Sequence, residues 1–216
     1  MKYIGMPIGM WALFAHSFRK QLTAVFGYDA DMANSITRKA KPRYREIIAG
    51  LPEFENADRF KMNIVNCAMI GAFILSMPEH PDVEQLTEYY AKAMMTKPMK
   101  WFCRTSGKKK FTEKDIADMK VTADLRAADR NPYSWNMDFF EYPDGSGYEC
   151  RFTKCGICVL MQNLGLYDLT PALCRLDYTM SEAGSVSDFV RKYTIASGGA
   201  YQNVRVALLT PPKYAF

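Results

Sequence analysis

Histidine is scarce in this sequence, because His16 and His80 are the only two among 216 residues. Histidine-rich zinc sites and Ser-His-Asp triads both depend on imidazole groups, so neither is readily built from this chain. His16 falls on the apolar side of a predicted helix, and we expect it in the core rather than at a reaction centre.

Long apolar runs are also missing. The most apolar stretch, "IVNCAMIGAFIL" at residues 64–75, is shorter than the ~20 residues that a membrane-spanning helix needs, and it predicts a buried helix. The early run "MPIGMWALFAHSF" has no basic cluster before it beyond Lys2 and no small-residue cleavage site after it. We therefore expect a cytoplasmic protein without a membrane partner.

Neither sign of charge dominates. The 28 lysines and arginines exceed the 23 acidic residues by five, and "GKKK" at residues 107–110 is the only basic run, with a solvated turn as its expected role. The chain also shows no nucleic-acid-binding motif. We expect a small-molecule substrate or ligand as its partner, no nucleic acid and no cofactor, and the sequence does not indicate an oligomeric state.

The spacing of apolar residues divides the chain near Pro132. Before it, apolar residues recur at three- and four-residue steps, which predicts helices over most of residues 8–126, with Pro42 kinking or dividing one of them. After it, two-residue alternation predicts strands at 133–142, 148–154, 187–195 and 201–208. We predict a single domain (1–216) of the α+β class, in which a helical N-terminal half (1–130) packs with a four-stranded, mainly antiparallel sheet in the C-terminal part (131–216).

Sulfur is what the second half does contain. Three of the six cysteines lie in "CRFTKCGIC" at residues 150–158, and Cys174 follows. These cysteines have three possible interpretations: a redox pair, a metal or iron–sulfur site, or a set of small buried side chains. Strand alternation puts Cys150 and Cys155 on opposite faces, so we expect no bound zinc or iron. Cys155 lies where a strand meets a helix N-terminus, which favours a thiolate and makes it the candidate nucleophile.

Charged and glycine-rich positions follow the cysteines. Asp177 is either a helix-end carboxylate bonded to backbone or a general acid/base beside Cys155. Arg175 and Arg191 are candidate clamps for a substrate carboxylate, or solvated residues. The segment Thr194–Gly199, with Gly198 and Gly199, forms either a backbone anion nest or a plain hairpin turn. We predict that Cys155, Asp177 and this segment line one pocket at the end of the sheet.

The run from Tyr148 to Gly199 resembles the L-2-amino-thiazoline-4-carboxylic acid hydrolase family. The resemblance is carried by "CGIC", then "LTPALCRLDYTMSE", then a strand ending in "TIASGG", in that order. The family's named reaction is the hydrolytic opening of a cyclic amidine to a carbamoyl-cysteine product. The resemblance therefore implies a hydrolase that acts on a small cyclic cysteine derivative.

One departure from the family pattern bears on activity. The pattern usually continues past the paired glycines with a Cys-Asp pair, but here Gln202 and Asn203 hold those two positions. Amide side chains do not titrate, although both can bind a substrate through hydrogen bonds. The alternative is thus a small-ligand-binding domain of the same family that has lost its chemistry.

Overall fold

The computed structural model describes residues 10–54, 58, 60–127, 129–185, 187–192, 194–200 and 202–208. The first part of the chain forms the helices α1 (Met10–Phe26), α2 (Ala30–Ala49), α3 (Lys61–Ile74), α4 (Val83–Met94), α5 (Lys97–Gly107) and α6 (Glu113–Ala127). The second part forms β1 (Asn136–Glu141), β2 (Gly147–Lys154), α7 (Gly156–Asn163), α8 (Thr170–Gly184), β3 (Ser187–Val190) and β4 (Gln202–Leu208), with short 3-10 turns at Tyr167–Leu169 and Ile195–Ser197. The predicted α+β class is confirmed.

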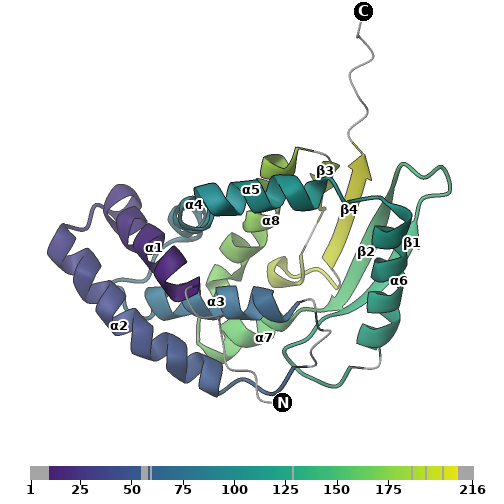
Figure 1. Cartoon of the computed structure of the whole chain (residues 1–216). Coiled ribbons are helices and arrows are strands. Elements are labelled where there is room, and N and C mark those ends of the chain that lie inside the picture. The colour runs from purple at the N-terminus through teal and green to yellow at the C-terminus, as the bar shows by residue number, and fades with distance from the viewer. Residues whose placement is uncertain are drawn as a thin grey trace, which may run out of the picture.

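The four described strands form one antiparallel sheet in the order β1-β2-β4-β3. Figure 1 shows the sheet on one side of the molecule and helices α1 and α2 on the other, with α3, α7 and α8 between them. Helix α6 packs on the sheet, where Met119 and Ala123 meet Met137, Tyr148 and Cys150. One face of the sheet is therefore covered, as is usual for antiparallel sheets.

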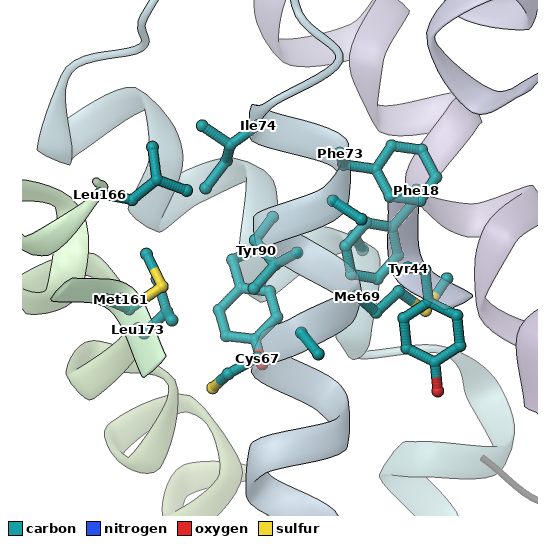
Figure 2. Close-up of a cluster of buried hydrophobic side chains, with 14 of the residues drawn as sticks. Phe18, Tyr44, Cys67, Met69, Phe73, Ile74, Tyr90, Met161, Leu166 and Leu173 are labelled. Atoms are coloured by element: carbon teal, nitrogen blue, oxygen red, sulfur yellow. The ribbon is translucent and has the colours of Figure 1, made fainter. Parts of the chain in front are cut away.

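Helix α3 is the centre of the helical part. Its residues from Ile64 to Ile74 are buried with the exception of Asn66, which fits the apolar run seen in the sequence. Helices from both halves of the chain surround it, and Figure 2 shows Phe73 beside Phe18 of α1, with Leu173 of α8 on the opposite side. Among the described residues, no helix is both long and apolar enough to cross a membrane.

The strand in the predicted range 187–195 ends much earlier, at Val190. Thr194 instead caps a 3-10 turn, because its hydroxyl accepts from the Ser197 N–H while the Ser197 hydroxyl accepts from the Thr194 N–H. Such local side-chain bonds compete with a sheet ladder, and Gly198 then takes a left-handed conformation with φ of 86°. The connection to β4 is consequently an irregular loop rather than the predicted tight hairpin.

Three smaller predictions differ from the structure in whole or in part. Pro42 lies inside α2 and does not divide it, because the helix runs on to Ala49 as one element. His16 is exposed and its Nδ1 lies 3.4 Å from Arg19 Nη2, so it does not belong to the core. The first strand also starts later than predicted, at Asn136, because the Asn131 side chain accepts from the Tyr133 N–H and holds the preceding residues in a turn.

Candidate functional site

A cavity of about 240 Å³ lies where the helices meet the sheet. Most of its wall is apolar, with aromatic rings from Phe60, Trp135 and Phe152 at its sheet end. Seven polar side chains also line it: Asn63, Asn66, Cys67, Tyr90, Cys155, Cys174 and Asp177. A mainly apolar wall with a few converging polar groups is typical of a small-molecule site.

Cys155 reaches the cavity because β2 ends there and α7 begins. It is the N-cap of α7, with extended backbone at φ −129° and ψ 115°, and only 5% of it is exposed. A hydrogen bond from the Cys158 thiol lowers the pKa of Cys155, and the backbone N–H groups of Ile157 and Cys158 add to this, against the opposing effect of burial. The thiolate expected from the sequence is therefore favoured by three donors.

Gly156 fixes the position of this helix start. A Cβ atom at this residue would lie 1.9 Å from the carbonyl oxygen of Tyr133 and 2.5 Å from its carbonyl carbon. The loop that carries Tyr133 and Trp135 therefore packs directly on the backbone that holds Cys155. Only a residue without a side chain permits this approach.

We expect Gly156→Ala to lower the free energy of unfolding by roughly 1–3 kcal/mol or more, because backbone rather than a flexible side chain must move. Urea unfolding followed by circular dichroism measures this. Gly50→Ala is the matched control, since its added Cβ would meet only the Glu46 and Ile47 carbonyl oxygens at 3.6 Å. Equal midpoints for the two variants would contradict the close approach at Gly156.

Asp177 lies on α8, and its carboxylate also lines the cavity. Its side chain keeps 49% of its surface accessible. Partial desolvation by the surrounding protein raises the pKa of Asp177, while the positive charges of Arg191 and Lys110 act in the opposite direction. The cavity thus joins a thiol whose pKa is lowered to a carboxyl whose pKa is raised.

Arg191 holds Asp177 in place. Its guanidinium pairs with the carboxylate, donates to the Cys174 carbonyl oxygen at 2.8 Å and stacks over the Phe189 ring at 4.9 Å. Only 3% of this side chain is exposed. The sequence suggested Arg191 either as a clamp for a substrate carboxylate or as a solvated residue; in the structure its guanidinium is paired with Asp177 and is not solvated. Arg175 instead pairs with Glu84 on the surface, at 2.6 Å.

The structure does not bring Thr194, Gly198 or Gly199 to the cavity wall. The N–H groups of the expected anion nest are used within their own turn, since Gly198 donates to Ile195 and Gly199 donates to the Thr194 carbonyl oxygen. Thr194 touches the site indirectly, through a hydrogen bond to the Cys174 thiol. The turn is therefore a support for the wall rather than part of it.

Residues 202 and 203 belong to β4, where they pair with Phe152 and Arg151 of β2. Phe152 lines the cavity, so position 202 is next to the wall in the ladder. The side chains of Gln202 and Asn203 lie outside what the structure describes.

Four polar residues of the wall come from the helical half and were not predicted: Asn63, Asn66 and Cys67 of α3, and Tyr90 of α4. Cys67 of α3 and Tyr90 of α4 share a hydrogen bond, and burial raises the pKa of each well above its ordinary value. Figure 2 shows the two side chains next to each other. An isolated Cys in the apolar run of residues 64–75 is the only signal that the sequence offers, and it is the signal of an ordinary core residue.

The cysteines do not all gather at one point. Cys67, Cys155 and Cys174 line the cavity and Cys158 lies beside Cys155, but Cys150 packs under α6 in a separate cluster. Burial raises the pKa of Cys174 to about 12. Within the described part of the chain, no three His, Cys, Asp or Glu side chains are arranged to hold a metal ion.

The fold and the site define an α+β protein with a thiol-and-carboxyl cavity between helices and an antiparallel sheet. A family model, L-2-amino-thiazoline-4-carboxylic acid hydrolase, matches residues 57–204, which hold all of the cavity wall described above. The chain belongs to this family. No curated protein and no solved structure gave a match.

Proposed function

We propose that the protein is a hydrolase that opens a small cyclic amidine of the 2-aminothiazoline type, with Cys155 as nucleophile and Asp177 as general acid/base. One observation carries the proposal: within the segment that matches the family, a thiol of lowered pKa and a carboxyl of raised pKa line the same cavity. Titratable groups whose environments move their pKa values in these ways are typical of acid–base and nucleophilic pairs.

The first step forms a bond between the Cys155 sulfur and the ring carbon that carries sulfur and two nitrogens. The ring bond from this carbon to sulfur or to nitrogen then breaks, and Asp177 transfers a proton to the atom that leaves. The product of this step is an open-chain group held on the Cys155 sulfur. The aromatic rings of Phe60, Trp135 and Phe152 enclose a planar heterocycle and keep bulk water away from it.

The second step consumes water. Asp177 accepts a proton from a water molecule, whose oxygen attacks the same carbon, and the Cys155 thiolate leaves. One water is used overall, and a carbamoyl-cysteine is released. Arg191 acts through Asp177 as a positioning residue, and Gln202 and Asn203 remain proposed substrate-binding positions because position 202 lies beside the wall residue Phe152.

The second candidate function is a ligand-binding domain without turnover. It is favoured by the amides at Gln202 and Asn203, where the family pattern has a thiol and an acid. Calorimetric binding of the thiazoline carboxylate, combined with chromatographic detection of the carbamoyl product, separates the two. Binding without product, together with product formation by the double variant Gln202→Cys and Asn203→Asp, would establish the second candidate.

For an active wild type, we expect Asp177→Asn to lower kcat about 10²–10⁴-fold while the dissociation constant changes little, because an amide cannot transfer the proton. Asp168→Asn is the matched control, since Asp168 is exposed and pairs with His80 at 2.8 Å. A wild-type rate in Asp177→Asn would remove this residue from the mechanism.

A further inference from the structure

Cys158 has no task in the proposed mechanism, yet it is placed against the nucleophile. It lies three residues after Cys155 in the first turn of α7, and its thiol donates a hydrogen bond to the Cys155 sulfur. The two thiols are therefore within hydrogen-bonding reach of one another at the start of α7, and Cys155 borders the cavity. This contact goes beyond what the spacing of a C-x-x-C motif establishes, because the motif alone does not orient its side chains.

We propose that Cys155 and Cys158 are a redox modification site, at which hydrogen peroxide converts the two thiols to a reversible disulfide. Disulfide formation at this site does not depend on the proposed function. The consequence of the disulfide, the loss of the nucleophile, does rest on the proposed function. A low-pKa thiol with a resolving thiol beside it is the arrangement found in redox-sensing cysteines.

The surroundings select which thiol reacts first. The Cys155 sulfur accepts hydrogen bonds from two backbone N–H groups and from the Cys158 thiol. These bonds stabilise its thiolate before any oxidant arrives. Cys67 and Cys174 also line the cavity, but burial raises the pKa of both, and protonated thiols react slowly with peroxide. Burial and the Cys155 charge likewise keep the Cys158 proton in place.

Access selects the oxidant. Cys155 is 5% exposed and borders the cavity, so a small solute reaches the sulfur through that space while a protein does not. Hydrogen peroxide is much smaller than the cavity. The disulfide is consequently expected to form with peroxide and to be reduced again by a small dithiol.

The chemistry balances in two steps. The Cys155 sulfur attacks one peroxide oxygen, the O–O bond breaks, and the second oxygen leaves as hydroxide, which becomes water. The Cys158 sulfur then attacks the resulting sulfenic sulfur, an S–S bond forms, and the sulfenic oxygen leaves as a second water with the Cys158 proton. Two thiols are oxidised and one peroxide is reduced to two waters.

The test is thiol mapping of the full chain. The reduced protein is treated with hydrogen peroxide, free thiols are blocked with iodoacetamide, and chymotryptic peptides are identified by mass spectrometry. We expect Cys155 and Cys158 to be joined at peroxide concentrations that leave Cys103 and Cys150 fully alkylated. Dithiothreitol is expected to restore all six thiols.

Two variants make the result specific. Cys158→Ser keeps a donor beside Cys155 but cannot form the bond, so peroxide should leave Cys155 as sulfenic or sulfinic acid. Cys174→Ala should still form the Cys155–Cys158 bond. A bond between Cys155 and Cys174, or alkylation of Cys155 and Cys103 in equal yield after peroxide, would overturn the proposal. These masses do not depend on turnover, so a failed ring-opening assay leaves the thiol result intact, and the reverse also holds.

Discussion

Replacing Cys155 by serine is expected to lower kcat/KM for ring opening by about 10³-fold or more, because loss of a covalent nucleophile removes most of the rate enhancement in such mechanisms. A serine hydroxyl at this helix start does not ionise near neutral pH, so the hydrogen bonds from Ile157 and Cys158 have no anion to stabilise. The substitution changes one atom, and binding of the cyclic amidine should survive within about tenfold.

Cys103→Ser is the matched control for this experiment. Cys103 is also a buried thiol, at 6% exposure, but it belongs to α5 and does not line the cavity. We expect the activity of Cys103→Ser to match that of the wild type, provided that Cys103→Ser and Cys155→Ser are both shown to be folded. If Cys155→Ser retains the wild-type rate, water rather than this thiol performs the attack, and the covalent step is wrong.

Removing the buried Arg126 is expected to have the largest effect on stability. Its Nη1 lies 2.9 Å from Asp58, 2.5 Å from Asp129 and 3.2 Å from the Ser134 hydroxyl, and 2% of the residue is exposed. Leucine in its place leaves the Asp58 carboxylate buried without its cation. Breaking a buried ion pair in this way costs about 3–5 kcal/mol of the free energy of unfolding.

This network matters to the site because it anchors the loop that follows α6. Asp129 and Ser134 lie on either side of Tyr133 in the chain, and the Tyr133 carbonyl oxygen packs on Gly156. Trp135, the residue after Ser134, lines the cavity. Arg126→Leu should therefore weaken ligand binding in addition to lowering the urea midpoint. Lys120→Leu is the control, since its exposed pair with Glu141 is worth at most about 1 kcal/mol. If Arg126→Leu and Lys120→Leu lowered the urea midpoint and ligand affinity equally, the role of the network would be contradicted.

The same network predicts sensitivity to acid. Burial acts to raise the pKa of Asp129, but hydrogen bonds from Asn131 and Ser134 and the charges of Arg126 and Lys154 outweigh it, so the pKa of Asp129 is lowered. A carboxyl whose pKa is lower in the folded state stabilises the fold above its unfolded pKa, and this stability is lost as the pH falls through the folded pKa. Arg126→Leu should therefore weaken the decline in unfolding free energy below about pH 4.

The fold class follows from the sequence because the change of apolar period at Pro132 marks the change from helices to sheet. The ends of the elements do not follow in the same way. The two-residue alternation of apolar residues predicted a third strand that continues to residue 195. In the structure this strand ends at Val190, and the capping hydrogen bonds between Thr194 and Ser197 form a turn after it. Such bonds depend on side chains three positions apart in one turn, and the spacing of apolar residues carries no information about them.

The residues of the candidate site were likewise predicted only in part from the sequence. Cys155 and Asp177 were named from local features, a strand-to-helix junction and a carboxylate three residues after Cys174, and they do line one cavity. Their assignment as catalytic residues remains a prediction. Cys67 and Tyr90 were not predicted because the helical half reaches the cavity only through the packing of α3, α4 and α5. The role of Arg191 also depends on such packing, because nothing local in the sequence pairs it with Asp177.

The most direct test of the central claim is to look for the covalent group on Cys155 during turnover. The protein is mixed with the thiazoline carboxylate, quenched in acid after single-turnover times, and its mass is measured before and after proteolysis. Wild-type protein quenched before the water step should carry the group, whereas Asp177→Asn, which lacks the acid for ring opening as well as the base for the water step, should form it more slowly. We predict a mass increase equal to the whole substrate, located on Cys155 and absent from Cys155→Ser. Product formation without any such mass on Cys155, at a rate that Cys155→Ser shares, would contradict the account.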